Sequence, residues 1–125
     1  MKISEAESKV LEVFWRAAGP LSAEDVVAAM DNDRDWSAGT IRTFLTRLVK
    51  KKALAAKPDG RRYLYRPLIP RDDYVHKQSR DLIDRLFAGK LAPFVAQFSA
   101  RHDLSDEEIE ELRRLVTKLK RGTEE

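Results

Sequence analysis

The sequence predicts a mainly α-helical protein with one small β-hairpin. Two observations carry this prediction. Along most of the chain, apolar residues recur at the three- and four-residue spacing of a helix with one buried face. The exception is a short alternating stretch around Pro58-Asp59-Gly60-Arg61, which has the pattern of two strands joined by a turn. The C-terminal part adds only further helices.

The composition excludes several kinds of metal site and catalytic site. The 125 residues contain two His and no Cys, which excludes disulfides, Cys-ligated zinc, iron–sulfur clusters and thiol catalysis. His76 and His102 lie in different segments, and the acid pairs Asp72/Asp73 and Glu107/Glu108 stand at helix starts, where capping explains them. We therefore expect no metal site, no cofactor and no enzymatic activity.

No apolar run approaches the roughly 20 residues of a membrane span. The first residues also lack the apolar region of a signal peptide. We expect a cytoplasmic protein without direct membrane insertion.

The first helix is predicted over residues 4–17. Ser4 and Glu7 have the spacing of a capping box, and Gly19-Pro20 ends the helical pattern. Ser22 caps a short second helix, and residues 31–35 form a polar turn.

The third helix is predicted over residues 37–52, with Ser37 as its N-cap. Its apolar residues share one face and are Ile41, Phe44, Leu45, Leu48 and Val49. The opposite face has no acidic residue and consists of Gly39, Arg42, Thr43, Thr46, Arg47 and Lys50.

A hairpin follows, with strands over residues 54–57 and 62–66 joined by residues 58–61. Its tyrosines, Tyr63 and Tyr65, are interpreted as packing residues. Pro67 and Pro70 mark a boundary, so the predicted domains are residues 1–70 and 71–125.

Three helices are predicted in the second region. The first opens at Asp72/Asp73 and ends near Gly89, the second covers residues 91–99, and the third covers residues 105–120. In the last helix Ile109, Leu112, Val116 and Leu119 have the 3-4-3 spacing of a coiled-coil seam.

The net charge of +3 is unevenly distributed. Residues 1–36 carry −4, residues 37–66 carry +8 and residues 67–125 carry −1. A stretch of +8 suits a polyanion, although a lysine-rich solvated face is the other interpretation.

Three helices followed by a hairpin is the order of a winged helix-turn-helix, whose second motif helix enters the DNA major groove. Arg can donate two parallel hydrogen bonds to guanine, and Thr can bond to a base or touch a thymine methyl. Lysines and hairpin arginines would hold phosphates. The function indicated is DNA binding.

The apolar faces of the C-terminal helices follow a domain that is already complete. Either they pack on one another or they form a symmetric dimer, which suits a palindromic DNA site. The predicted dimerisation residues are Leu82, Leu86, Phe94, Phe98, Ile109, Leu112, Val116 and Leu119.

The chain resembles the penicillinase repressor (BlaI/MecI) family over nearly its whole length. The resemblance is carried by Trp36-Ser37-Ala38-Gly39-Thr40-Ile41-Arg42-Thr43-Phe44-Leu45-Thr46-Arg47-Leu48-Val49-Lys50-Lys51, with Glu5-Ala6-Glu7, Val13-Phe14-Trp15, Gly60-Arg61, Tyr65, Asp73-Tyr74, Leu104-Ser105 and Glu108-Ile109-Glu110-Glu111-Leu112.

The resemblance implies a homodimeric bacterial repressor of transcription on a palindromic operator. Such repressors control β-lactam resistance or a related stress operon and their own gene. They release DNA when a membrane sensor-protease leads to cleavage in the dimerisation region. The candidate DNA contacts are Ser37, Thr40, Arg42, Thr43, Thr46, Arg47, Lys50, Lys51, Arg61 and Arg62.

Three positions depart from the family pattern. Ala38-Gly39 stands where relatives often have Pro-Lys, and Lys52 stands where they often have Gly. Gln97-Phe98 aligns with the cleaved Asn-Phe bond and is the candidate cleavage site. The cysteines of the copper-responsive branch are absent, so copper sensing by that route is excluded.

Two alternatives remain open at this point. One is a MarR-like winged-helix regulator that releases DNA on binding a small ligand. The other is a helical protein-interaction module. Steep salt dependence of duplex binding distinguishes DNA-binding proteins from the latter, because phosphate contacts release counterions.

Overall fold

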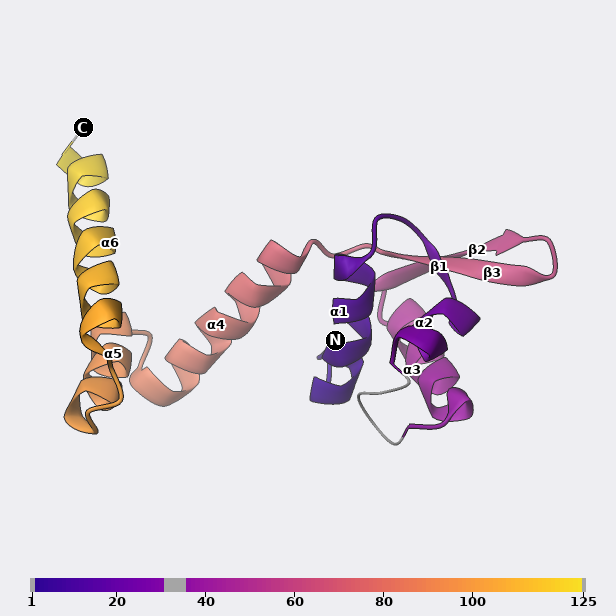
Figure 1. Ribbon diagram of the computed structural model, residues 1–125, viewed down its shortest axis with the longest axis horizontal. Helices are drawn as coiled ribbons and strands as arrows, with labels where there is room; N and C mark the ends of the chain where they lie inside the picture. Colours follow the sequence, from indigo (N-terminus) through magenta and orange to yellow (C-terminus); the bar gives the residue numbers. More distant parts are fainter. Residues whose placement is uncertain (1, 31–35, 125) are drawn as a thin grey trace. The chain divides into compact units, whose positions relative to one another are not determined.

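The protein has six helices and a small antiparallel sheet in its described part (Figure 1). The computed structural model describes residues 2–30 and 36–124, so the predicted polar turn at residues 31–35 lies outside the described residues. The chain divides into two compact units, Met1–His76 and Lys77–Glu125. The mainly α fold class is confirmed.

The N-terminal unit begins with three short helices, α1 (Glu5–Arg16), α2 (Ala23–Ala29) and α3 (Ala38–Lys50). A serine caps each of them, as predicted. In α1 and α2 the cap is a reciprocal capping box, in which Ser4 pairs with Glu7 and Ser22 with Asp25. These hydrogen bonds fix where each helix starts.

The sheet has three strands in the order β1-β3-β2, where β1 is Leu21–Ser22, β2 is Leu54–Asp59 and β3 is Arg62–Pro67. The predicted hairpin is β2–β3. Strand β1, which pairs with Tyr65 and Leu64 of β3, was not predicted. Two residues are too few to show an alternating pattern.

The hairpin turn is tighter than predicted. Pro58 and Asp59 belong to β2 rather than to the turn, and Asp59 pairs with Arg62 across a two-residue loop. Pro58 is tolerated because β2 is an edge strand. Gly60 has a φ of 64°, which a two-residue hairpin loop requires at its first position.

The core of this unit lies between the three helices and the sheet. Leu11, Leu45 and Leu48 are fully buried, and Leu54 of β2 packs with them. Trp36 and Tyr65 are half-buried against the same cluster, whereas Tyr63 is 54% exposed, so only one of the two hairpin tyrosines packs as predicted.

The C-terminal end of α3 explains one departure from the family pattern. The N–H of Lys52 donates to Val49 O and the N–H of Ala53 donates to Leu48 O, which is a Schellman motif. This motif places Lys52 in the left-handed region, with a φ of 63°. Glycine adopts that conformation without strain, so the Gly that the family resemblance implies at this position has a physical reason.

The boundary between the units lies beyond the predicted one at residue 70, because the start of α4 (Arg71–Phe87) packs on α1. The indole N–H of Trp15 donates to Ile69 O at 2.9 Å, and the Trp15 ring contacts Tyr74 with centroids 5.4 Å apart. Arg71 also pairs with Glu12. These contacts join the first turn of α4 to the N-terminal unit.

The C-terminal unit contains the rest of α4 together with α5 (Leu91–Ala100) and α6 (Asp106–Glu124). Phe94 contacts Phe87 and Phe98 edge-to-face. Most of the remaining large apolar side chains are exposed, and they include Leu86, Leu91, Phe98, Ile109, Leu115, Val116 and Leu119.

Candidate nucleic-acid interface

The exposed face of α3 carries the predicted DNA-contacting side chains. Ile41, Leu45 and Leu48 are buried, which turns Arg42, Thr43, Thr46, Arg47 and Lys50 to the solvent. The burial pattern therefore brings the five together on one helix face. It follows from the amphipathic sequence of α3, whose apolar residues face the core.

Ser37 and Thr40 build the N-terminus of α3. The N–H of Thr40 donates to Ser37 Oγ at 3.1 Å, and the two hydroxyls share a hydrogen bond of 3.0 Å. Both residues shape the end of the helix whose free N–H groups suit a phosphate.

Thr43 and Thr46 use their hydroxyl protons within the helix. Thr43 Oγ1 donates to Gly39 O at 3.0 Å, and Thr46 Oγ1 donates to Arg42 O at 3.1 Å. In this state each hydroxyl oxygen still has acceptor capacity for an incoming donor.

Arg42 is paired with an acid that comes from another helix. Its Nη2 lies 3.0 Å from Glu24 Oε1, and the two side chains are 53% and 64% exposed. The pKa of Glu24 is lowered, first by a hydrogen bond from its own backbone N–H and then by the hydrogen bond from Arg42. Thus α3 itself has an acid-free face, but folding adds a carboxylate to it.

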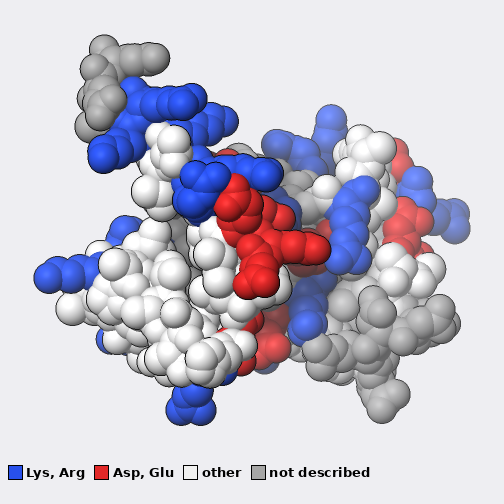
Figure 2. Space-filling model, turned by 60° about the vertical axis from the view of Figure 1, so that its left-hand side comes forward, with Lys and Arg blue, Asp and Glu red and all other residues white. Residues whose placement is uncertain are grey.

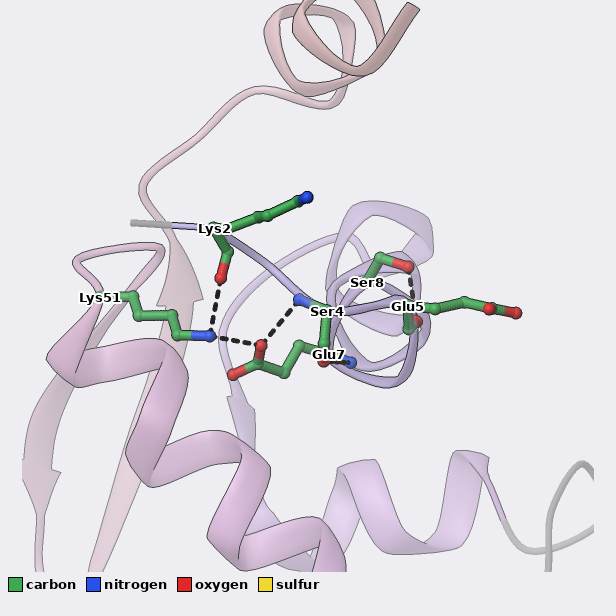
Figure 3. A network of polar contacts seen from close by, with 6 residues as sticks. All are labelled: Lys2, Ser4, Glu5, Glu7, Ser8 and Lys51. Carbon is green, nitrogen blue, oxygen red and sulfur yellow. Dashed lines mark hydrogen bonds and ion pairs between the residues drawn. The ribbon is translucent and has the colours of Figure 1, made fainter. Parts of the chain in front are cut away.

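Lys51 points toward Glu7 and the backbone of Lys2 (Figure 3). Its ammonium donates to Glu7 Oε1 at 2.5 Å and to Lys2 O at 2.8 Å. The side chain is only 22% exposed and that of Glu7 only 2%. Because its charge is held by an internal carboxylate, we remove Lys51 from the candidate phosphate contacts.

Glu7 is a buried carboxylate whose charged form the fold maintains. Burial raises its pKa, but hydrogen bonds from Lys51 and Ser4 outweigh burial, so the pKa lies below its ordinary value. Glu7 Oε2 has no hydrogen-bond partner among the described residues, and the hydrogen bonds of the network go to Oε1. The capping role of Glu7 was predicted from its spacing to Ser4, whereas its pairing with Lys51 could not be predicted from a local pattern.

The hairpin presents several basic side chains to the solvent. Arg61 lies in the two-residue turn, and Arg62 pairs with Asp59 at 3.3 Å while remaining exposed. Lys57 and Arg66 are exposed on the strands. In Figure 1 the hairpin extends beyond the helices of its unit, so these cations are accessible to a long polyanion.

The described residues contain no group of three or more His, Asp or Glu side chains arranged to hold a metal ion. His76 is exposed, and His102 lies in the left-handed turn that ends α5. Among the helices of the described part, none is long and apolar enough to cross a membrane.

The family comparison covers almost the whole chain. The model of the penicillinase repressor family matches residues 3–118. The methicillin resistance regulatory protein MecI of Mammaliicoccus sciuri is 36% identical over 117 residues, which is 94% of each chain. The penicillinase repressor of Bacillus licheniformis is 34% identical over 124 residues, covering 99% of this chain and 96% of the relative.

Two kinds of solved structure are similar. B. licheniformis BlaI in its monomeric form, in complex with the blaP half-operator, has 36% identity and a TM-score of 0.52 over 59% of this chain and 89% of that one. Wild-type MarR from E. coli, at 19% identity and a TM-score of 0.52 over 94% of this chain and 77% of that one, shows a shared fold alone. The chain belongs to the penicillinase repressor family.

Proposed function

We propose that this protein is a sequence-specific DNA-binding repressor of transcription that inserts α3 into the major groove. The observation that carries the proposal is the exposed face of α3, where Arg42, Thr43, Thr46 and Arg47 are held outward by a fully packed opposite face. The half-operator complex of the related BlaI supports it. The family match favours this function over an interaction module and over a MarR-like regulator.

The contacts divide by chemistry. Arg42 and Thr43 are the proposed base readers, because Arg donates bidentate hydrogen bonds to guanine and Thr accepts, donates or contacts a methyl group. Ser37, Thr40, Thr46 and Arg47 flank them. Lys50, Arg61 and Arg62 are proposed phosphate contacts, which set affinity and register but read no sequence.

A homodimer formed by the C-terminal unit is the second part of the proposal. Val116 and Leu119 are 62% and 70% exposed, which is unusual for a repeated apolar seam. A hollow of about 470 Å³ between α5 and α6 is lined by Phe94, Phe98 and Leu112, among others. A second copy of the chain is the proposed cover for this surface.

The charge on α6 fits such pairing. Its first turns are acidic, and Arg113, Arg114, Lys118, Lys120 and Arg121 follow in its second half. Figure 2 shows basic side chains gathered toward the C-terminal end, acidic ones below them, and uncharged surface beside them. Opposite charges along one helix favour antiparallel contact between two copies.

The proposed targets are a β-lactam resistance gene or a related stress operon, together with the repressor's own gene. Relief of repression by a membrane sensor-protease would act on the C-terminal unit. The candidate bond, Gln97-Phe98, joins two exposed residues of α5. Because it lies within a helix, cleavage requires that α5 open locally.

Footprinting on the DNA upstream of the protein's own gene tests the function. The expected result is protection of a dyad whose half-sites lie one or more helical turns apart. Binding should weaken steeply with salt, because phosphate contacts release counterions. No protection at low salt with folded protein would refute the proposal.

Sedimentation tests the dimer. The variant Leu119→Asp places a charge in the exposed seam, and Thr117→Asp introduces the same charge at a neutral, exposed position of α6 outside the seam as a control. The first should sediment as a monomer with weakened operator binding, because each half-site alone binds weakly. Equal dimer stability in both variants would contradict the proposed seam.

A further inference from the structure

Among the residues that the structure describes, a carboxylate from another helix pairs with the exposed face of α3. Glu24 lies in the first turn of α2, and its Oε1 accepts a hydrogen bond of 3.0 Å from Arg42 Nη2. This ion pair joins α2 to the exposed face of α3. It involves the residue best suited to read a base.

A carboxylate in this position lowers affinity for any DNA. It repels phosphates, and it competes with the bases for the Arg42 guanidinium. Ser22 and Asp25 form the capping box of α2, so Glu24 is not a member of that box, although its carboxylate also accepts a hydrogen bond from its own backbone N–H. Several neutral residues have a helix propensity as high as that of Glu, so helix formation alone does not require a carboxylate at this position. The hydrogen bond with Arg42 therefore gives a specific reason for a carboxylate at position 24.

The geometry leaves Arg42 able to bind a base while it is held. Guanidinium has five N–H donors, and Glu24 takes one hydrogen bond from Nη2. Two donors are enough for the bidentate contact with guanine O6 and N7. A guanidinium restrained by a carboxylate loses less side-chain freedom on binding and has fewer alternative partners.

We propose that Glu24 is a specificity-determining positioning residue, which holds the Arg42 guanidinium in the orientation that reads a base and penalises binding where that base is absent. The inference rests on the proposed function, because it requires α3 to read DNA. Glu24 acts through Arg42. Its removal should lower discrimination between sequences while non-specific binding becomes tighter.

The test compares the full-length wild-type protein with Glu24→Gln, which keeps the size of the side chain and removes its charge. The duplex is the sequence that the wild-type protein enriches from a randomised library. Dissociation constants are measured on that duplex, on each of its single-base-pair variants and on a scrambled duplex at one salt concentration. Glu5→Gln is the matched control, since Glu5 is also an exposed first-turn acid of the N-terminal unit.

The expected result is position-specific. Glu24→Gln should lose about two- to fivefold of discrimination at one base pair, the scale of an exposed ion pair, and bind the scrambled duplex more tightly. In the Arg42→Ala background the same substitution should leave discrimination at that base pair unchanged. Glu5→Gln should leave the whole profile unchanged.

Three other outcomes distinguish a failure of the role of Glu24 from a failure of the proposed function. An unchanged discrimination profile in Glu24→Gln, with wild-type discrimination intact, would overturn the role of Glu24 and leave the proposed function standing. So would a loss that persists in the Arg42→Ala background, because Glu24 would then not act through Arg42. Failure of the wild-type protein to enrich any sequence would overturn both proposals.

Discussion

Helices α3 and α6 have the same kind of amphipathic sequence but different surroundings. In α3 the apolar residues Leu45 and Leu48 are 0% exposed, because α1, α2 and β2 cover them. In α6 Val116 and Leu119 are 62% and 70% exposed. The spacing of apolar residues thus predicts which face of a helix is apolar, but not whether the same chain covers that face.

The exposed faces differ as well. The face of α3 opposite the core is basic and polar, as suits a polyanion, and within residues 2–30 and 36–124 its acidic contact comes from α2. The charges of α6 change sign along its length, as suits a second copy of the same helix. The apolar face of α3 is covered by other elements of the same chain, and we propose that the apolar face of α6 is covered by a second copy of the chain.

The largest expected effect is on the core beneath α3. Leu45→Ala should lower the free energy of unfolding of the N-terminal unit by about 3–5 kcal/mol, because a fully buried leucine leaves a cavity. Chemical denaturation followed by tryptophan fluorescence measures this change, since Trp15 and Trp36 both lie in this unit.

The matched variant in the other helix is Leu119→Ala. At protein concentrations where the chain is monomeric it should leave the unfolding followed by far-ultraviolet circular dichroism, which reports the helices of both units, unchanged, because Leu119 is 70% exposed. Equal destabilisation by the two substitutions would show that α6 is covered within the chain, and the contrast between the helices would fail.

The next effect concerns how α3 is anchored to α1. Lys51→Met removes the ammonium that pairs with Glu7 and leaves a nearly buried carboxylate alone. Breaking such a pair should cost about 2–3 kcal/mol at pH 7, allowing for the partial exposure of Lys51. Arg113→Met, which breaks an exposed pair in α6, should leave the transition of the N-terminal unit unchanged.

The cost of Lys51→Met should depend on pH. In the wild-type protein the pKa of Glu7 is lowered from 4.5, so its carboxylate contributes stability above pH 4.5 that is lost as pH falls through the lowered pKa. Without Lys51 the pKa of Glu7 is higher than in the wild-type protein, because the hydrogen bond and the charge of Lys51 both lower it, so the penalty of the substitution shrinks as pH falls. The free energies of unfolding of the two proteins, measured by denaturation, should differ at pH 7 and approach each other below pH 4. A difference of the same size at both pH values would contradict the pairing of Lys51 with Glu7.

The smallest effect lies at the end of α3. Lys52→Gly should raise the free energy of unfolding by about 0.5–1 kcal/mol, because Lys52 has a φ of 63°. Lys52→Ala removes the same charge without relieving the strain and is the control. His102, with a φ of 58° at the end of α5, offers the same test in the C-terminal unit. Equal stability of the Gly and Ala variants would contradict this explanation.

Local patterns predicted much of this molecule. Ser4, Ser22 and Ser37 each begin a helix as expected, because a cap depends on residues within one turn. The apolar face of α3 was predicted by periodicity, and its burial places Arg42, Thr43 and Arg47 at the surface.

The features that could not be predicted from the sequence depend on contacts between residues far apart along the chain. Strand β1 exists only because β3 pairs with it. Lys51 lies in a basic run and carries the same charge as its neighbours, yet it pairs with Glu7, 44 residues away. Glu24 meets Arg42 across 18 residues. A periodic pattern within one segment does not indicate contacts with a distant segment.

The most direct test of the account compares Arg42→Ala with Lys50→Ala, two exposed cations of α3, on the operator and on a scrambled duplex. Arg42→Ala should cost about 1–3 kcal/mol on the operator and far less on the scrambled duplex, because it removes a base contact. Lys50→Ala should weaken both alike, as loss of a phosphate contact does. If Arg42→Ala weakened both duplexes equally, or neither, α3 would not be the helix that reads the sequence.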